Sequence, residues 1–301
     1  MSAPALEKAA ELLEEVARRD VPVGPLTTYR VGGNAALFVE IDGEPDLEAV
    51  CTAVSVSGVP VLVVGKGSNL LVADAGFPGL AVQLGEGFTG ITTEDTVLEA
   101  GGGAACPVVA RRSVAAGLTG MEWAVGVPGS VGGAVAMNAG GHGSETKDRL
   151  AAADVVDLAS ASPQPRSIPA ADLDLSYRHS AIGASHLVLR ARFALDRGDP
   201  EEGAARIAEI VRWRRENQPG GQNAGSIFTN PPGDSAGRII DAAGLKGFRI
   251  GTAQVSDKHA NFIQADNGGS ADDVRRVIET VRDLVARRTG IELQVEVRLV
   301  G

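Results

Sequence analysis

The sequence predicts an α+β protein with more than one domain, in which short apolar strands run into glycine-rich loops. The chain has 301 residues, 44% of them hydrophobic and 22% charged, which is enough to bury the cores of two or three domains. Its 39 glycines gather after apolar strands without a fixed repeat. A strongly periodic helix and an alternating apolar segment close the chain. Helix-forming and strand-forming periods therefore both occur, in separate stretches.

The first part of the chain predicts a strand, a helix and a second strand. Residues 37–41 have the composition of a strand, residues 46–57 have a helical pattern that ends at Gly58, and residues 61–64 form a wholly apolar strand. The preceding N-terminal stretch mixes Glu, Lys and Arg in a helical pattern, so we expect a helix there and not a signal peptide. We therefore expect residues 1–79 to form a first lobe with an N-terminal helix.

A second lobe is predicted for residues 80–197. It has strand signals at residues 97–100, a helix at about 107–116 and a long strand at 186–195. The charged, turn-rich run at residues 196–203 predicts a linker. A third domain, residues 198–301, then starts with a helix that contains Ile207, Ile210, Val211 and Trp213.

The last helix has the clearest signals in the sequence. Ser270 and Asp273 have the spacing of a capping box, Arg287 and Arg288 stand in the last turn, and Gly290 follows as the C-terminal cap. One face is apolar, formed by Val274, Val277, Ile278, Val281, Leu284 and Val285.

The ten residues after that helix, 291–300, alternate strictly and predict a strand. One face carries only apolar side chains: Ile291, Leu293, Val295, Val297 and Leu299. The other face is polar: Glu292, Gln294, Glu296 and Arg298. Solvent is the default environment of such a face.

Composition excludes several classes of protein. The formal net charge of -10 and a pI near 5.0 argue against nucleic acid or an anionic membrane surface as partner. No apolar stretch approaches the roughly 20 residues of a membrane span, so we expect a cytoplasmic protein. Cys51 and Cys106 predict no disulfide, and the four scattered histidines predict no metal site. The oligomeric state stays open, and a monomer is compatible with the sequence.

Residues 61–72, VLVVGKGSNLLV, form the first glycine loop. Gly65, Lys66, Gly67, Ser68 and Asn69 follow an apolar strand and offer backbone N–H groups, a hydroxyl and a positive charge. That chemistry suits a phosphate. The loop is not a Walker A motif, and Leu70 stands where GxGxxG requires its third glycine, so both common nucleotide folds are disfavoured.

Residues 124–143, AVGVPGSVGGAVAMNAGGHG, form the second glycine loop and have few side chains to pack. Either loop alone is more often a turn, because glycine is the default residue for strained backbone. Two such loops in one chain, one of them with Lys, Ser and Asn, favour a diphosphate ligand.

Eight segments together resemble the UDP-N-acetylenolpyruvoylglucosamine reductase family. They cover nearly the whole chain, and their order is more specific than any one of them. The segments are TTYRVGG (27–33), GKGSNLLV (65–72), GVPGSVGGAVAMNAG (126–140), YRHS (177–180), AGSIFTNP (224–231), AGLKG (243–247), VSDKHANFI (255–263) and EVRLVG (296–301).

The resemblance implies a two-lobed FAD-binding domain of the vanillyl-alcohol-oxidase type followed by a C-terminal α/β substrate-binding domain. It implies noncovalent FAD, NADPH as hydride donor, and reduction of an enolpyruvyl UDP-sugar for the cell wall. Its cofactor-binding positions fall on the N-terminal segment and the two glycine loops: Tyr29, Arg30, Gly65, Lys66, Gly67, Ser68, Asn69, Leu70, Val127, Pro128, Gly129, Ser130, Gly132, Gly133, Ala134 and Asn138.

The same resemblance implies Arg178, Ser226 and Glu296 as catalytic residues. Their side chains suit the reaction. Hydride addition to an enolpyruvyl ether leaves enediolate charge that a guanidinium stabilises. A positioned hydroxyl can then supply a proton to the ether carbon. Without the resemblance, the ordinary interpretations would be a surface ion pair for Arg178, a turn residue for Ser226 and a solvent-exposed carboxylate for Glu296.

Further residues are predicted to contact substrate. Lys258, His259 and Asn261 stand between two apolar strands, where burial without an anion is costly. Weaker candidates for the substrate phosphate or carboxylate are Tyr177, Arg214, Asn230, Lys246 and Arg298.

Some features of the chain depart from the family's pattern and leave the details of its UDP contacts open. Thr229 and Asn217 stand where lysine is frequent, and His142 stands where an aromatic residue is frequent. One subtype closes a tyrosine-bearing flap over the substrate, but this chain has only Tyr29 and Tyr177. It therefore resembles the flapless subtype. Two alternatives remain: another FAD oxidase or dehydrogenase of this fold, and a non-catalytic module that binds FAD or a UDP-sugar.

Overall fold

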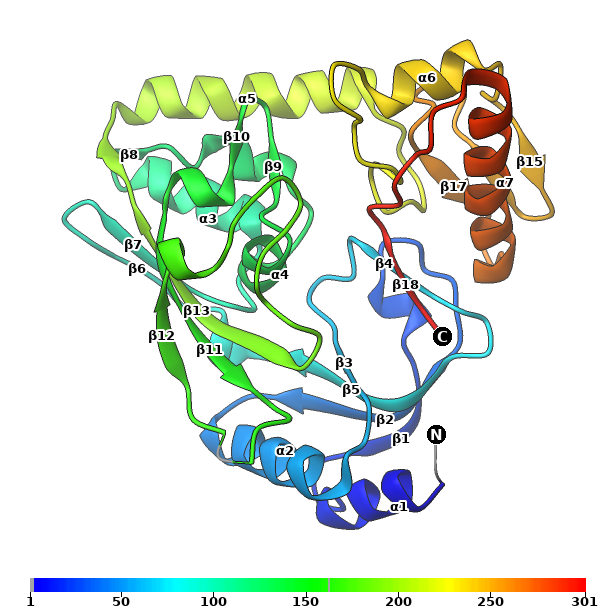
Figure 1. Cartoon of the computed structure of the whole chain (residues 1–301). Coiled ribbons are helices and arrows are strands. Elements are labelled where there is room, and N and C mark those ends of the chain that lie inside the picture. The colour runs from blue at the N-terminus through cyan, green and yellow to red at the C-terminus, as the bar shows by residue number, and fades with distance from the viewer. Residues whose placement is uncertain (1–2, 162) are drawn as a thin grey trace. The chain divides into compact units, whose positions relative to one another are not determined.

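The structure is a computed structural model that describes residues 3–161 and 163–301 (Figure 1). The chain forms two compact units, each assembled from three separate stretches. The first unit comprises Met1–Asp20, Ala36–Lys66 and Pro78–Trp213, and the second comprises Val21–Ala35, Gly67–Phe77 and Arg214–Gly301. The domain boundaries expected after residues 79 and 197 stay a prediction.

One sheet of the first unit has the strand order β1-β2-β5-β3. These strands are β1 (Arg18–Pro22), β2 (Asn34–Ile41), β3 (Val61–Val63) and β5 (Phe77–Leu84). Helices α1 (Ala3–Leu12) and α2 (Glu44–Ser57) share a core with it. Gly58 ends α2 at φ 67°, a left-handed conformation that glycine adopts without strain. The predicted strand, helix and strand are confirmed, with β3 parallel to β5.

The other sheet of the first unit is antiparallel, in the order β12-β11-β13-β7-β6. Its strands are β6 (Ile91–Glu94), β7 (Val97–Gly101), β11 (Leu150–Asp157), β12 (Arg166–Pro169) and β13 (His186–Ala194). Helices α3 (Cys106–Ala115) and α4 (Val131–Ala136) pack on it around a core that includes Trp123 and Phe193. The strands and the helix predicted for this lobe are confirmed.

The predicted linker at residues 196–203 is wrong. Strand β14 (Asp196–Arg197) pairs with β8 (Leu118–Thr119), and helix α5 (Pro200–Asn217) begins three residues later. The Asp199 carboxylate accepts a hydrogen bond of 2.7 Å from the backbone N–H of Glu201 at the start of this helix. The charged and turn-forming residues that begin this helix give the same sequence pattern as a linker.

The second unit surrounds a core of its own. The antiparallel sheet β15-β16-β17 and the parallel pair β18-β4 contribute strands β4 (Leu70–Val72), β15 (Arg249–Ile250), β16 (Ala253–Val255), β17 (Ile263–Ala265) and β18 (Arg298–Val300). Helices α6 (Ala236–Ala242) and α7 (Ala271–Thr289) pack on this core. The apolar face predicted for α7 is confirmed, with Val274 and Val281 buried, and Gly290 caps its end at φ 74°.

Half of the predicted capping box of α7 is present. The Ser270 hydroxyl accepts a hydrogen bond from the Asp273 N–H at 3.1 Å. The Asp273 carboxylate, however, accepts from the backbone N–H and the hydroxyl of Thr252 at 2.7 and 2.9 Å. The predicted reciprocal bond, from the Ser270 N–H to the Asp273 carboxylate, is wrong. The Ser270 N–H donates instead to the Thr252 hydroxyl oxygen, while Thr252 donates to the carboxylate.

The strand predicted for residues 291–300 is too long. Only β18 is a strand, because the chain first bonds with residues 227–229 and then changes partner to β4. Leu293, Val297 and Val300 are buried, but Leu299 is 41% exposed, so the strict alternation fails there. In the described ranges, no helix combines the length and apolar character that crossing a bilayer requires.

Candidate functional site

Ser226 follows a tight turn in the second unit. The side-chain oxygen of Asn223 accepts a hydrogen bond of 3.0 Å from the Gly225 N–H, which closes an Asx turn. Gly225 then adopts φ 76°, a left-handed conformation that a residue with a side chain rarely adopts. The sequence AGS therefore positions a half-buried serine directly after the turn.

Glu296 lies on the segment next to Ser226. The Glu296 N–H donates to the Ile227 carbonyl at 2.7 Å, and the Thr229 N–H donates to the Gln294 carbonyl at 2.9 Å. A backbone bridge joins Phe228 to Val295. The structure thus brings Ser226 and Glu296, which are 70 residues apart in sequence, onto neighbouring hydrogen-bonded segments of one unit.

The first glycine loop fixes the other side of the Glu296 segment. The Asn69 amide donates to the Glu296 carbonyl at 3.1 Å, and the Arg298 N–H donates to the Asn69 carbonyl at 3.0 Å. Beyond Asn69, β4 and β18 continue as parallel neighbours. The loop motif therefore holds the backbone of the predicted catalytic carboxylate.

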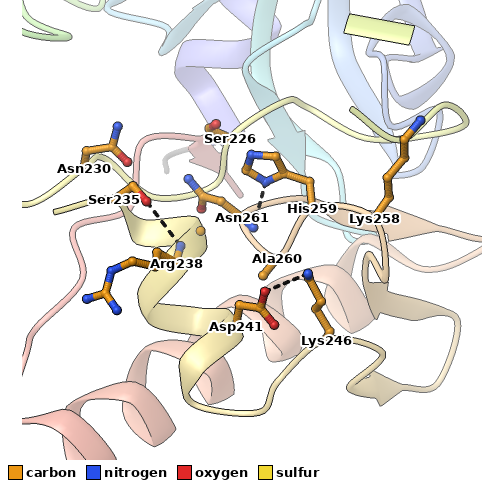
Figure 2. A pocket seen from close by; sticks show the side chains of 11 residues that line it. Ser226, Asn230, Ser235, Arg238, Asp241, Lys246, Lys258, His259, Ala260 and Asn261 are labelled. Atoms are coloured by element: carbon orange, nitrogen blue, oxygen red, sulfur yellow. Dashed lines mark hydrogen bonds and ion pairs between the residues drawn. The ribbon is translucent and has the colours of Figure 1, made fainter. Parts of the chain in front are cut away.

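A cavity of about 400 Å³ opens beside Ser226 (Figure 2). It brings five predicted substrate residues of this unit together with Ser226, namely Asn230, Lys246, Lys258, His259 and Asn261. The remaining lining residues are Ser235, Gly237, Arg238, Asp241 and Ala260. Two lysines, an arginine and a histidine against one aspartate give this cavity a chemistry suited to an anion.

Carboxylates hold two of the cations that line this cavity. Lys246 forms an ion pair of 2.7 Å with Asp241, as Figure 2 shows, and Arg238 pairs with Asp234. The pairing and a backbone N–H bond from Ser235 hold the pKa of Asp234 at about 2. An incoming anion must therefore compete with these carboxylates for the cations.

His259 presents one defined ring nitrogen as a donor. Its Nδ1 accepts a hydrogen bond of 3.2 Å from the Asn261 N–H, which leaves Nε2 to carry the proton of the neutral ring. Burial lowers the pKa of His259, and the nearby Lys246 lowers it further. His259 is thus favoured as a neutral hydrogen-bond donor in a cavity that it lines.

Asn230 takes part in positioning α6. Its side-chain oxygen accepts from the Ala236 N–H at 3.0 Å, while the Ser235 hydroxyl caps the same helix by accepting from the Arg238 N–H at 3.3 Å. The Lys258 ammonium donates to the Arg215 carbonyl at 2.7 Å. Substrate contacts from Asn230 and Lys258 stay predictions, since both side chains also stabilise the fold.

Arg178 belongs to the first unit, at the tip of a two-residue turn. Ser176 and His179 exchange backbone hydrogen bonds of 3.1 and 3.0 Å across Tyr177 and Arg178, and Arg178 takes φ 57°. The guanidinium donates to the Gly140 carbonyl at 3.0 Å and stands 4.9 Å from the centre of the Tyr177 ring. Such a strained, anchored cation is a candidate functional residue.

The turn that carries Arg178 is held by Asn138 and Ser180. Asn138 is fully buried, donates to the Ser176 carbonyl at 2.8 Å and accepts from the Lys147 N–H at 2.9 Å. The Ser180 hydroxyl donates to the Ala136 carbonyl at 2.7 Å. The Asn138 side chain thus holds this turn inside the first unit, and the cofactor contact predicted for Asn138 stays a prediction.

The first glycine loop fits a phosphate. Across the described residues, the N–H groups of Gly65, Lys66, Gly67 and Ser68 donate no hydrogen bond to the protein. Consecutive open N–H groups beside a lysine are the chemistry of an anion-binding loop. A Cβ on Gly67 would lie 2.4 Å from the Leu26 carbonyl oxygen, and Gly67 has φ 61°, so this position requires glycine.

The second glycine loop is engaged within its own unit. The N–H groups of Val131, Gly132 and Gly133 donate to the carbonyls of Ala104 and Gly102 and to the Ser130 hydroxyl, at 2.9, 2.8 and 3.3 Å. Its end forms a hairpin of β9 (Gly140–Gly141) and β10 (Ser144–Glu145). The cofactor contacts predicted for this loop stay predictions, and they would have to use atoms other than these engaged N–H groups. The residues concerned are Val127, Pro128, Gly129, Ser130, Gly132 and Gly133.

Three further cofactor predictions fall on buried side chains. Tyr29 is 0% exposed in the core of the second unit, and burial raises its pKa. Leu70 and Ala134 are 8% and 5% exposed. The cofactor contacts predicted for these three residues, and for the exposed Arg30, stay predictions.

The remaining predicted substrate residues lie outside the cavity lining. Tyr177 and Arg298 are exposed, and Arg214 is half-buried, with its Nε donating to Gln218 at 2.7 Å. Sequence reasoning missed Ser235, Arg238 and Asp241. The helix-start pattern of Ser235 and the charges one turn apart on α6 could have indicated them.

The comparisons with known proteins agree with this arrangement. Residues 217–300 match the family model of the UDP-N-acetylenolpyruvoylglucosamine reductase C-terminal domain, and residues 35–162 match that of an FAD binding domain. The reductase of Heliobacterium modesticaldum is 44% identical over 93% of this chain and 89% of that protein. The reductase of Acidiphilium cryptum is 42% identical over 100% of this chain and 97% of its own length.

A solved structure gives the same result for the fold. The crystal structure of UDP-N-acetylenolpyruvylglucosamine reductase from Thermus caldophilus matches with a TM-score of 0.81 and 34% identity, covering 95% of this chain and all of that one. The expected FAD-binding fold with a C-terminal domain is confirmed. By its sequence, its fold and the residues gathered around Ser226, the chain belongs to the UDP-N-acetylenolpyruvoylglucosamine reductase family.

Proposed function

We propose that this protein reduces the enolpyruvyl ether of UDP-N-acetylglucosamine to the lactyl ether of UDP-N-acetylmuramate, with NADPH as electron donor and noncovalently bound FAD. Family membership supports the reaction. The observation that carries the assignment is the adjacency of Ser226 and Glu296, whose segments share the hydrogen bond from the Glu296 N–H to the Ile227 carbonyl at 2.7 Å. A proton donor that lines the cavity is thereby held next to the segment that carries the carboxylate.

The cofactor supplies one step of the chemistry. When bound, FAD would supply the hydride chemistry that links NADPH to the methylene carbon of the substrate. The open N–H groups of Gly65–Ser68 and the Lys66 ammonium would hold its diphosphate. Lys66 is exposed, so its charge is free to meet a ligand from solvent.

Arg178 stabilises the negative charge that develops on the substrate carboxylate. Hydride addition converts the unsaturated acid into an enediolate, and a guanidinium held by the Gly140 carbonyl can stabilise that charge without reorganising. The two-residue turn and the buried Asn138 limit its motion. Removal of such a preorganised donor costs roughly 10²–10³ in rate in comparable systems.

Ser226 protonates the ether carbon of the enediolate. An alcohol is a weak acid, but the carbanionic carbon is more basic than the alkoxide that remains. Glu296 then acts on the same intermediate as a charged or hydrogen-bonding group. Its backbone is held on one side by Asn69 and on the other by Ile227.

The cavity binds the diphosphate of the UDP-sugar. Lys246, Arg238 and the Nε2–H of His259 supply charge and directed hydrogen bonds in about 400 Å³. We further propose a cytoplasmic protein with small-molecule partners and without nucleic acid or membrane as a partner. The net charge of -10 supports this proposal.

Anaerobic spectroscopy of the purified holoenzyme tests the function. NADPH should bleach the flavin absorbance, and the enolpyruvyl UDP-sugar should restore it with one lactyl ether formed per flavin reoxidised. Persistent bleaching in the presence of the enolpyruvyl sugar, together with reoxidation by another acceptor such as oxygen, would support an oxidase of the same fold. In that case a sugar or lactone would act as electron donor and bleach the flavin. A protein that cannot be reconstituted with FAD would refute the flavin assignment.

A further inference from the structure

Asn261 is a buried side chain that binds the backbone next to Ser226. It is 3% exposed. Its amide nitrogen donates to the Phe228 carbonyl at 2.8 Å, and its amide oxygen accepts from the Phe228 N–H at 3.0 Å. One side chain therefore satisfies both backbone groups of one residue, as a neighbouring strand would.

The backbone of Asn261 adds two more bonds. Its carbonyl accepts from the Ile227 N–H at 2.9 Å, and its N–H donates to His259 Nδ1 at 3.2 Å. Figure 2 shows Asn261 below Ser226 and the His259 ring, with a dashed line that marks its hydrogen bond to the ring. Asn261 thus contacts the segment after the serine and the ring that lines the same cavity.

We propose that Asn261 is a positioning residue for the proton transfer, which sets the Ser226 hydroxyl and the His259 ring against the substrate. This inference rests on the proposed function and replaces a direct substrate contact of the Asn261 side chain. Its amide is already committed to Phe228 in both directions. Little of it is exposed to a ligand.

Ser226 requires such a support because its N-terminal side is a glycine. A Cβ on Gly225 would meet no atom within 4 Å, so packing does not confine this residue. The segment after the serine is held between Asn261 and the 294–296 segment. Proton transfer requires heavy atoms about 2.6–3.2 Å apart, and a misplacement of about 1 Å can cost about 10²-fold in rate.

Two substitutions separate the two hydrogen bonds. Asn261→Leu keeps the approximate shape and removes both polar partners of Phe228. Asn261→Asp keeps an acceptor for the Phe228 N–H and removes the donor to its carbonyl. In the holoenzyme, each variant should slow reoxidation of the reduced flavin by the enolpyruvyl UDP-sugar by about 10-fold to 10²-fold. Bleaching by NADPH should change less than about threefold.

A double-mutant cycle distinguishes positioning from general loosening. If Asn261 acts through the serine hydroxyl, Asn261→Leu should slow reoxidation no further in a Ser226→Ala background. Asp74→Ala is the control for stability: Asp74 accepts from the Ala271 N–H at 2.8 Å at the start of α7 in the same unit. It should lower the melting temperature and leave both half-reactions nearly unchanged.

Three results would overturn the inference. These are equal slowing of the two half-reactions, an additive effect in the Ser226→Ala background, and normal reoxidation in Asn261→Asp. If Asn261→Leu does not fold, Asn261→Asp decides alone, because it keeps the acceptor for the Phe228 N–H and removes only the donor to the Phe228 carbonyl. Failure of the proposed function has a separate signature: the wild-type flavin would not be reoxidised by the sugar at all.

Discussion

Ser226→Ala should separate the chemistry of this site from its stability. The hydroxyl is half-buried beside the cavity, while the backbone around it is held by the Asn223 Asx turn, by Asn261 and by the 294–296 segment. Removal of one oxygen leaves all of these bonds in place. The free energy of unfolding should therefore change by less than about 0.5 kcal/mol.

The catalytic loss should be large and confined to one half-reaction. A positioned general acid contributes roughly 10² to 10⁴ in rate, so reoxidation of the flavin by the enolpyruvyl UDP-sugar should slow by that factor. Hydride transfer from NADPH needs no proton donor at the sugar and should stay near its normal rate. Substrate affinity should change little, because the hydroxyl acts mainly in the transition state.

Ser235→Ala is the matched control, because Ser235 lines the same cavity. Its hydroxyl caps α6 by accepting from the Arg238 N–H at 3.3 Å, so its loss should cost about 1 kcal/mol of stability. Flavin reoxidation in this variant should stay within a few fold of normal. Urea unfolding and anaerobic stopped-flow absorbance measure both quantities on each protein.

The reasoning would be refuted by the reverse pattern. If Ser226→Ala slows both half-reactions alike, or leaves reoxidation unaffected, the serine is a turn residue and the proton comes from elsewhere. If Ser235→Ala slows reoxidation as much as Ser226→Ala does, the cavity tolerates no loss of a hydroxyl and the assignment to one donor fails.

Three further predictions follow from the cavity and the C-terminal segment. Glu296→Gln should keep the fold and the FAD but lower turnover by at least about tenfold. The control, Glu292→Gln at an exposed position nearby, should have nearly normal turnover, and equal activities of the two variants would mean that Glu296 only faces solvent. Asp241→Asn should free Lys246 from its 2.7 Å ion pair and tighten UDP binding about two- to fivefold at low salt in calorimetry, and weaker binding would contradict an anion site. Burial lowers the pKa of His259, so below the ordinary value of 6.5 the unfolded chain binds a proton that the folded chain does not, and stability should fall as pH falls through that range. His259→Gln should flatten this dependence in urea unfolding between about pH 8 and about pH 5.5, and an unchanged slope would assign it to other groups.

Local structure was predictable where one segment supplies its own evidence. Helix α7 has its cap residues and its apolar face within about 20 consecutive positions, and α2 ends at a glycine that the sequence marks. The segment 291–300 failed because its conformation depends on two partners, residues 227–229 and β4, which no local pattern specifies. Thr252 likewise takes the Asp273 carboxylate from 21 residues away.

The boundaries of the two compact units also depend on contacts between distant stretches, which no local pattern specifies. Residues 21–35 and 67–77 belong with the C-terminal stretch, although both come from the first quarter of the chain. Glycines in these stretches make close approaches that no side chain could fit: a Cβ on Gly32 would stand 2.3 Å from the Val72 carbonyl oxygen. Sequence position alone cannot reveal a contact of this kind, since glycine also marks ordinary turns.

Some motif asparagines that the sequence assigned to a ligand bind the backbone of the protein itself. Its amide has the donor and the acceptor of a peptide group, so a motif asparagine can bind a ligand or another stretch of backbone with the same atoms. Asn69, Asn138 and Asn261 all bind backbone here, at Glu296, Ser176 and Phe228. Ser176 precedes the Arg178 turn and Phe228 follows Ser226 by two residues, so each of the three amides fixes the backbone at or near a predicted catalytic residue. A motif in this chain therefore specifies the position of the reacting groups as much as the groups themselves, and each of these asparagines should be tested by half-reaction kinetics rather than by ligand affinity alone.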